Sequence, residues 1–453
     1  MDRLQILGPD MYRDLKNAFA GGFTHGNSLY IKKTCYDVSS WDFTSSYPAV
    51  MVAERFPMGY PEYVDCSELP EDEFLKAIRL YCCMFTIVFY DLEEKPEVFE
   101  NYISQSKCIK LSSDAVVNNG RVVSASYCEL TITEVDYEII KQLYDWSEYQ
   151  VSNLYKWIRG YLPRDFVLAI LELYKNKTEL KGVEGKEAEY MVSKGMLNSC
   201  YGMAVTDIVR EINEYSDEWE TPYYPEIDAE IAKYNRKRGR FLYYPWGIYV
   251  TAYARRNLFT AILEAGEDYI YSDTDSIKLM NTEAHRAYFE AYNAEILDKL
   301  EYALEYQGIP LEYIRPKTIK GIEKPLGVWD YEGTYTRFKS LGAKRYLLEK
   351  DGKIELTVSG LNKKIAVPYL LEKYKTNDAV FEHFREGLSV PPGQTGKMTH
   401  TYIDTPRTGL VTDYKGKTIE YEELTGVHLE NAGYDLSIAA SFNQFLLWKM
   451  KGI

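Results

Sequence analysis

Two aspartates separated by a single residue carry the clearest chemical signal in this chain. Asp273 and Asp275 lie in the segment Y-S-D-T-D-S (271–276), which apolar residues flank on both sides. This pattern predicts a β-hairpin whose tight turn displays both carboxylates. Neighbouring carboxylates repel each other unless a cation lies between them, and oxygen ligands suit Mg²⁺. For this segment alone, the alternative is an ordinary solvated turn of Asp, Thr and Ser.

A third aspartate follows an expected strand. Asp42 opens the segment D-F-T-S-S-Y-P (42–48). Thr44 or Ser45 can cap a helix there, and Pro48 is tolerated in the first turn. Asp42 is therefore expected beside a helix N-terminus, whose free N–H groups can bind a phosphate. A routine connection between a strand and a helix is the simpler explanation of this segment on its own.

A third pattern lies in the segment K-G-M-L-N-S-C-Y-G (194–202). On a helix, Lys194, Asn198 and Tyr201 share one face. A cation, an amide and an aromatic ring in one stripe can bind a triphosphate and stack beneath a base or sugar. The alternative is a solvated helix face that ends in a glycine cap.

Positioning these segments requires a mixture of helices and strands. A strand–turn–strand is expected over 268–280, and strand-rich stretches over 60–165 and 320–368. Hydrophobic periodicity and capping signals predict helices within 166–205, over 246–265, over about 282–306 and at the end of the chain. The mixed order favours an α+β fold over a doubly wound parallel sheet.

Composition limits the classes of protein. The chain has 453 residues and is 46% apolar, which excludes wholesale disorder. Its seven cysteines form no C-x-x-C pair, so a disulfide framework and a zinc site are not expected. No apolar run approaches the ~18 residues that span a bilayer, and the first residues lack the apolar core of a signal peptide. These features predict a cytoplasmic protein without a membrane partner.

The charge distribution is uneven. A net charge of −15 argues against a protein that coats nucleic acid nonspecifically, but it does not exclude a locally basic cleft. Residues 207–230 contain nine carboxylates, and residues 233–240 contain five basic side chains. A solvated hairpin explains this block, and a basic tip that contacts a phosphate backbone is the functional alternative.

In this order, the three segments resemble motifs A, B and C of the family B DNA polymerases. Those motifs read D-x-x-S-L-Y-P, K-x-x-x-N-S-x-Y-G and Y-x-D-T-D-S, and only Ser46 departs from them, replacing Leu. A-G-G-F (20–23) resembles the Y-x-G-G motif of the protein-primed branch of phages and linear plasmids, with Phe19 in place of Tyr. Residues 247–255 resemble the helix before motif C, and K-R-Y (344–346) resembles the K-x-Y motif. The resemblance covers roughly residues 15–365.

The resemblance implies an α+β right-hand fold with palm, fingers and thumb, plus two insertion subdomains. The expected divisions are palm at 1–60 and 246–375, fingers at 166–205, thumb and C-terminal region at 376–453, and insertions at 61–165 and 206–245. The insertions occupy the places of that branch's two terminal-protein regions.

The resemblance also implies a two-metal site with Mg²⁺, for which Mn²⁺ is a substitute. Asp42, Asp273 and Asp275 would be catalytic, and Asp42 and Asp275 would bind the metals together with the Phe43 carbonyl. The expected nucleotide-binding residues are Ser45, Ser46, Tyr47, Lys181, Lys194, Asn198 and Tyr201. The expected DNA-binding residues are Gly21, Gly22, Gly202, Thr274, Lys344 and Tyr346. For Lys177 and Lys181, a solvated lysine is an equally good explanation.

The implied function is template-directed addition of dNTPs to a primer 3′-hydroxyl. Its partners would be primer-template DNA and dNTPs, and for a phage or plasmid product its location would be the cytoplasm of a bacterial host. Priming by a terminal protein and docking of a separate exonuclease chain both stay open. The pairs D-x-E at 91–93 and 136–138 resemble loop and strand residues, so no proofreading exonuclease is expected. The alternatives are a gap-filling or translesion polymerase and a catalytically idle nucleic-acid-binding subunit.

Overall fold

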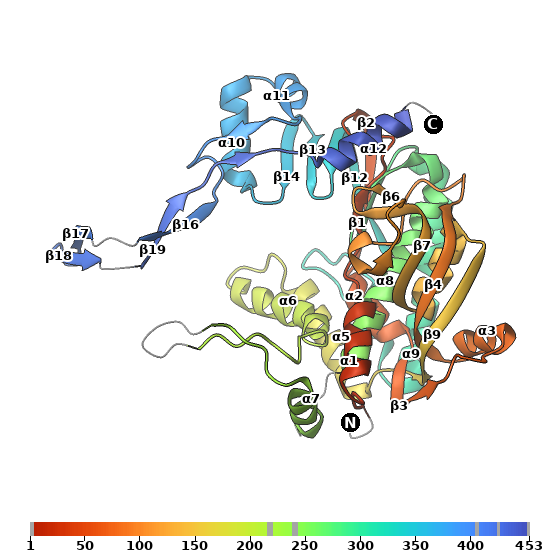
Figure 1. Ribbon diagram of the computed structural model, residues 1–453. Helices are drawn as coiled ribbons and strands as arrows, with labels where there is room; N and C mark the ends of the chain where they lie inside the picture. Colours follow the sequence, from red (N-terminus) through yellow and green to blue (C-terminus); the bar gives the residue numbers. More distant parts are fainter. Residues whose placement is uncertain (1–3, 215–220, 238–242, 404–406, 424–425, 451–453) are drawn as a thin grey trace. The chain divides into compact units, whose positions relative to one another are not determined.

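The computed structural model describes residues 4–214, 221–237, 243–403, 407–423 and 426–450, and the chain forms two compact units (Figure 1). The first unit holds the described parts of Met1–Ser28, Ser39–Gly333 and Trp448–Ile453. The second unit holds those of Leu29–Val38 and Thr334–Leu447. Helices and antiparallel sheets alternate along the chain, so the expected α+β class is confirmed.

The first sheet of the first unit carries two of the three chemical segments. Its strands are antiparallel and lie in the order β1 (Thr24–Gly26), β10 (Tyr269–Asp273), β11 (Ser276–Leu279) and β2 (Thr34–Phe43), of which Ser39–Phe43 belong to this unit. Residues 269–272 and 276–279 are all buried. Both strands of this hairpin are therefore buried on both faces.

A second antiparallel sheet fills most of residues 56–160. Its strands follow the order β3 (Phe56–Val64), β9 (Glu148–Gly160), β4 (Cys82–Glu94), β7 (Arg121–Thr133) and β5 (Cys108–Leu111), with β6 (Val116–Asn118) on β7 and β8 (Tyr144–Asp145) on β4. Two helices accompany it, α3 (Glu71–Leu80) and α4 (Glu134–Leu143). Thr133 caps α4 because its side chain accepts a hydrogen bond from the Asp136 backbone N–H, as in a capping box.

The central helix of the first unit is α8 (Tyr244–Ala265), which packs against several other helices of the unit. Most residues of α8 are buried on every side of the helix, as its apolar composition requires. Its side chains join both hydrophobic cores of the unit, and Figure 1 shows it against the sheet of β4, β7 and β9. The other helices are α1 (Pro9–Ala18), α2 (Ser46–Ala53), α5 (Arg164–Glu179), α6 (Glu187–Gly202), α7 (Ile227–Arg236) and α9 (Thr282–Gln307).

The second unit is built on β12 (Trp329–Gly342), of which Thr334–Gly342 belong to this unit, and on β13 (Arg345–Lys350) and β14 (Lys353–Val358). Asp351 and Gly352 form the two-residue turn between β13 and β14, and both have positive φ (51° and 71°), as such hairpin turns require. Helices α10 (Lys363–Tyr374) and α11 (Asn377–His383) follow. The expected strand-rich stretch up to 368 is wrong at its end, because Asn362 caps α10 by accepting a hydrogen bond from the Lys364 N–H.

Short strand pairs complete the second unit. They are β15 (Ser389–Val390) with β20 (Tyr434–Asp435), β16 (Met398–Ile403) with β19 (Gly426–Asn431), and β17 (Arg407–Thr412) with β18 (Thr418–Glu423). The expected final helix is α12 (Ala440–Met450).

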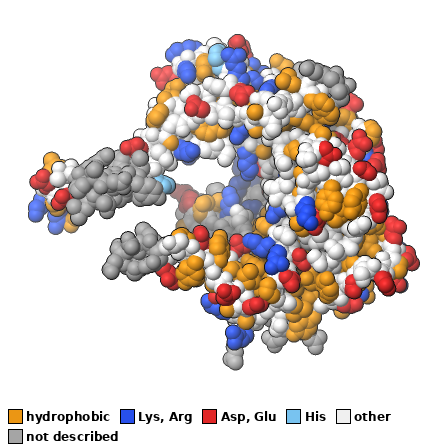
Figure 2. All heavy atoms as spheres, viewed as in Figure 1, with side chains coloured by type: hydrophobic (Ala, Val, Ile, Leu, Met, Phe, Trp, Pro, Cys, Tyr) orange, Lys and Arg blue, Asp and Glu red, His pale blue; other side chains and the backbone are white. Residues whose placement is uncertain are grey.

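Two sequence features concern the surface. Part of the charged block lies outside the described residues, namely 215–220 and 238–242, and α7 occupies most of the stretch between them. Figure 2 shows acidic side chains spread over the visible face, in keeping with the net charge of −15. Within the described parts of the chain, no helix is both long and apolar enough to cross a membrane.

Candidate active site

The β10–β11 hairpin displays the aspartate pair as expected. Asp273 and Ser276 face each other at the end of the ladder, so Thr274 and Asp275 form the turn. Thr274 adopts the left-handed conformation (φ 59°), and its N–H donates to the Phe23 carbonyl of the segment before β1. The turn is therefore fixed to the N-terminal segment through its own backbone.

Asp42 reaches the same end of the sheet because of the strand register. It pairs with Ser276 at the end of β2, and the Phe43 N–H donates to the Asp275 carbonyl at 2.8 Å. Main-chain hydrogen bonds therefore place Asp42 beside Asp275, although the two residues are far apart in the chain.

The two carboxylates disfavour each other's charge. Burial, followed by the charges of the nearby Asp275 and Glu332, raises the pKa of Asp42 to about 7. Burial also raises the pKa of Asp275, with Asp273 as the next contribution. Lysines 177 and 278 oppose both shifts. A cation bound between Asp42 and Asp275 would relieve this repulsion, and their oxygen donors fit Mg²⁺.

The Asp273 carboxylate is hydrogen-bonded to two neighbouring hydroxyls. Its side chain accepts hydrogen bonds from the hydroxyls of Thr24 (2.7 Å) and Thr274 (3.2 Å). Among the residues that the structure describes, no three His, Cys, Asp or Glu side chains are grouped closely enough to hold one metal ion. The arrangement therefore offers two carboxylates to a metal, with Asp273 bound to hydroxyls beside them.

Most of the sequence-predicted residues line a single cavity of about 530 Å³ in the first unit. Helix α6 contributes Lys194, Asn198 and Tyr201 from one face, as its spacing predicts. The remaining residues of the cavity that were expected at the site are Asp42, Phe43, Ser45, Ser46, Tyr47, Lys177, Lys181, Thr274 and Asp275. Two carboxylates and three lysines thus share one cavity, which suits a metal-bound polyphosphate.

The floor of the cavity brings two tyrosines together. The ring centroids of Tyr47 and Tyr201 lie 4.6 Å apart, and the rings are tilted by 57°. Gly22 lies beside them, because an ideal Cβ on Gly22 would be 2.9 Å from the Tyr47 hydroxyl and 2.7 Å from Thr274 Cγ2. The same construction at Gly21 meets nothing within 4 Å. Only the second glycine is thus required for close packing.

Ser45 differs from its expected role as a helix cap. It is the residue before α2, but it has left-handed backbone angles (φ 62°, ψ 67°) and makes no side-chain capping bond. Its hydroxyl instead accepts a hydrogen bond from Lys177 Nζ at 2.8 Å. Burial and the charges of Lys194 and Lys181 lower the pKa of Lys177. Clustered lysines with this environment are suited to an anionic ligand.

Five of the six expected DNA-binding residues do not line this cavity, and two of these, Gly21 and Gly22, line a different one. Lys344 and Tyr346 belong to the second unit, where Lys344 lies between β12 and β13 with positive φ (53°), and the Tyr346 ring lies 5.3 Å from that of Phe338. Gly202 is the last residue of α6, and an ideal Cβ there meets nothing within 4 Å. Their roles in binding DNA stay predictions.

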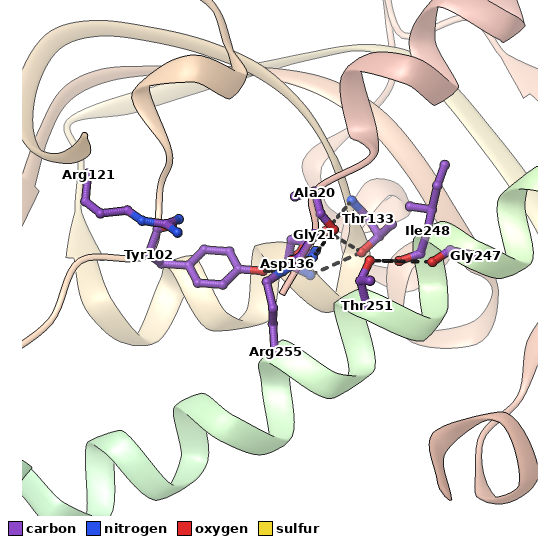
Figure 3. Close-up of polar contacts among 10 residues, drawn as sticks. All are labelled: Ala20, Gly21, Tyr102, Arg121, Thr133, Asp136, Gly247, Ile248, Thr251 and Arg255. Carbon is purple, nitrogen blue, oxygen red and sulfur yellow. Dashed lines mark hydrogen bonds and ion pairs between the residues drawn. The ribbon is translucent and has the colours of Figure 1, made fainter. Parts of the chain in front are cut away.

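A buried network behind the glycines was missed by sequence reasoning (Figure 3). Arg255 of α8 donates to the carbonyls of Ala20 and Gly21 and pairs with Asp136 of α4 at 2.6 Å. Tyr102 joins by donating to Asp136 and accepting from Arg255 Nε. The sequence resemblance included Arg255, but no local signal indicates that Asp136 is its partner.

The two D-x-E pairs lie on different elements. Asp91 and Glu93 lie within β4, where both are exposed. Asp136 and Glu138 lie on helix α4, so the expected loop or strand placement is wrong for this pair. Asp136 is buried and forms an ion pair with Arg255, so a structural role is enough to explain an aspartate at this position.

Comparison with known proteins assigns the family. Residues 1–294 match the family described as DNA polymerase type B, organellar and viral. The DNA polymerase of Bacillus phage B103 is 27% identical over 411 residues, covering 86% of this chain and 60% of that protein. The DNA polymerase of Bacillus phage phi29 is 25% identical over 405 residues, covering 84% of this chain and 58% of that protein.

Solved structures share the fold. Phi29 DNA polymerase complexed with primer-template DNA and incoming nucleotide substrates aligns with a TM-score of 0.60 at 21% identity, covering 95% of this chain and 63% of that one. The post-translocation binary complex with primer-template DNA aligns with a TM-score of 0.61. The chain belongs to the type B DNA polymerases of the organellar and viral family, as a homologue of the phi29-like branch that its motifs resemble. It spans about 60% of the length of these phage relatives.

Proposed function

We propose that this chain is a template-directed DNA polymerase that adds dNTPs to a primer 3′-hydroxyl, as its relatives' names suggest. The observation that carries the proposal is the single cavity in which residues 42–47, 194–201 and 274–275 meet. Three segments far apart in the sequence supply carboxylates, lysines and aromatic rings there. Phosphoryl transfer depends mainly on positioning and on neutralising charge, which such a set can provide.

In this proposal Asp42 and Asp275 bind Mg²⁺, with the Phe43 carbonyl as a further ligand and Mn²⁺ as a substitute. A pair of such ions would stabilise charge on the attacking and leaving oxygens. Asp273 supports the hairpin turn through its bonds to Thr24 and Thr274. The raised pKa values of Asp42 and Asp275 support the metal-binding role, because a bound cation would stabilise the ionised form of both carboxylates.

The other cavity residues bind the nucleotide in this proposal. Lys194, with Lys181 and Lys177, faces the triphosphate as a point charge. Asn198 and Tyr201 line the pocket of the nascent base pair, with Ser45 and Ser46 beside them. Tyr47 stacks beneath the deoxyribose, where its ring excludes a 2′-hydroxyl.

The DNA-binding roles follow the family pattern. Gly21 and Gly22 permit close approach of the template backbone beside Thr274, and Gly202 ends the nucleotide-binding helix. Lys344 and Tyr346 steady the primer terminus. Residues 1–60 and 246–375 form the palm, 166–205 the fingers, and 376–453 the thumb, with 61–165 and 206–245 as the two terminal-protein regions. Priming by a terminal protein is the branch-specific part of the proposal.

We further propose that this chain does not trim 3′ ends. Among the described residues, Asp136 of one D-x-E pair is committed to Arg255, and the other pair lies within a strand. A gap-filling or translesion role would also suit such an enzyme, and processivity and fidelity assays separate the two.

Primer extension tests the proposal directly. Wild type, Asp275→Asn and the matched control Asp298→Asn, an exposed aspartate on α9, are compared with Mg²⁺ and dNTPs. Extension by wild type and Asp298→Asn but not by Asp275→Asn is expected, with no trimming in a lane without dNTPs. Equal extension by all three would contradict the metal-site assignment. No extension by any would favour the idle binding subunit.

A further inference from the structure

A buried lysine lies beside the paired carboxylates on the β2–β11 ladder. Lys278 faces Ser40 across this ladder, in the same way that Ser276 faces Asp42. Alternate residues of a strand point to the same face, so Lys278 and Ser40 lie on the face of Ser276 and Asp42, about 6.8 Å further along the strands. The register therefore fixes one lysine next to the candidate metal ligands.

The contacts of Lys278 neutralise its charge only in part. Its side chain is 6% exposed, and its Nζ donates to Ser40 Oγ at 2.7 Å. Ser40 Oγ in turn donates to Glu332 at 2.7 Å, whereas Nζ itself lies 4.0 Å from the Glu332 carboxylate. The Glu332 side chain is 47% exposed, so water screens its charge more strongly than that of the buried ammonium.

Two lysines, Lys177 and Lys278, therefore lie near Asp42 and Asp275, and they differ in their access to the cavity. Lys177 lines the open cavity, whereas Lys278 is buried and does not line it. Lys177 is placed to meet a nucleotide, and its side chain is already bonded to Ser45. Lys278 has no such access, so a role in binding substrate does not explain it.

We propose that Lys278 is a fixed internal counter-ion of the candidate metal site. It offsets the charge repulsion between Asp42 and Asp275 before any metal binds, and it weakens Mg²⁺ binding because its charge repels the ion. Tight binding then requires the further negative charge of an incoming triphosphate, so the metal is retained together with the nucleotide. The inference rests on the metal site of the proposed function and makes Lys278 a positioning residue.

Thermal unfolding of the full chain tests this without any activity measurement. The unfolding temperature is followed with EDTA and across a Mg²⁺ titration, without nucleotide. Lys278→Met should unfold at a lower temperature in EDTA, and its half-saturating Mg²⁺ concentration should fall on the order of tenfold. An unchanged or higher half-saturating concentration would overturn the proposal.

Two further variants separate charge from packing. Ser40→Ala removes the hydroxyl link but no charge, so its half-saturating Mg²⁺ concentration should stay within about twofold of wild type. Glu332→Gln removes the negative charge that partly neutralises Lys278, and it should raise the half-saturating Mg²⁺ concentration. If Lys278→Met does not fold, Lys278→Gln, which removes the charge but keeps a polar partner for Ser40, is measured in its place, and an unchanged half-saturating Mg²⁺ concentration would overturn the proposal.

The variant Asp275→Asn tests whether Mg²⁺ binds at this aspartate. It should lose the Mg²⁺ response, and a full response in this variant would place the ion elsewhere and overturn the inference. Primer extension by wild type is scored separately. A chain that fails to extend a primer but binds Mg²⁺ more tightly after Lys278→Met would refute the polymerase proposal and retain the counter-ion.

Discussion

The guanidinium of Arg255 and the carboxylate of Asp136 lie 2.6 Å apart, and each side chain is only 4% exposed. Arg255 also donates to the carbonyls of Ala20 and Gly21, so the ion pair determines where the N-terminal glycines lie. Through Gly22 this position reaches Thr274 and Tyr47 at the cavity. A pair on α8 and α4 thus supports the candidate active site from behind.

The Arg255–Asp136 pair should be energetically coupled. Asp136→Asn leaves a buried guanidinium without its counter-charge, and we expect a loss of about 3–5 kcal/mol in the free energy of unfolding. In a double-mutant cycle with Arg255→Met, the coupling should be about 2–3 kcal/mol, measured by urea unfolding. If the losses of the two single variants simply add in the double variant, the predicted coupling is absent. The ion pair between Arg256 of α8 and Glu54, the residue after α2, is the control, and its disruption should affect primer extension less.

Gly22→Ala should impair extension where Gly21→Ala does not. A Cβ at Gly22 would lie 2.7 Å from Thr274 Cγ2, so the hairpin turn must shift, whereas the space beside Gly21 is open. Small displacements at a reacting centre cost rate, and we expect a loss of roughly tenfold or more in kcat for Gly22→Ala. Single-turnover extension measures it. Equal rates for both variants would show that the contact does not matter.

Tyr47→Val should relax discrimination against ribonucleotides. The Tyr47 ring lines the cavity and packs near Tyr201, and in the proposed function it lies beneath the deoxyribose. Steric selection of this size corresponds to roughly 10–200-fold, so the ratio of dNTP to rNTP incorporation should fall by that order. Incorporation kinetics with dATP and ATP provide the measurement. Tyr201→Val, which alters the neighbouring ring, is the comparison, and an equal effect would argue against a specific role of Tyr47.

Glu134 should make stability depend on pH. Burial raises its pKa from 4.5 to about 7, although Tyr249 donates a hydrogen bond to it and Arg159 lies near. Between these two values the folded state binds a proton that the unfolded state has released. Stability is therefore favoured below pH 4.5 and declines as pH rises to about 7.

The measurement compares wild type with Glu134→Gln, which does not titrate. Relative to this variant, the free energy of unfolding of wild type should fall by up to roughly 3 kcal/mol between pH 4.5 and 7.5. Glu138→Gln, an exposed position on the same helix, should follow wild type. A flat difference between wild type and Glu134→Gln would refute the prediction.

Local sequence patterns predicted the parts of the site that depend on local structure. The apolar flanks of residues 271–276 specified the hairpin, and the spacing of Lys194, Asn198 and Tyr201 specified a helix face. That these segments meet at one cavity followed only from the family resemblance, because spacing within a segment contains no information on its distant neighbours. The roles of the individual residues stay predictions.

Features that depend on long-range register could not be predicted. Lys278 looked like one polar residue in an apolar strand, and only its pairing with Ser40 places it beside Asp42. Ser45 has the residue type of a helix cap, but the nearby Lys177 offers its hydroxyl a different partner. Asp136 belongs to a D-x-E pair by sequence, and its burial against Arg255 became visible only in three dimensions.

The main-chain ladder between β2 and β11 has a consequence for how such chains diverge. Asp42 and Asp275 are brought together by backbone pairing across roughly 230 intervening residues. The entropy of closing so long a loop grows only with the logarithm of its length, and doubling the loop would cost about 0.6 kcal/mol. Whole subdomains can therefore be gained or lost between the two strands over evolution while the spacing of the two carboxylates stays unchanged.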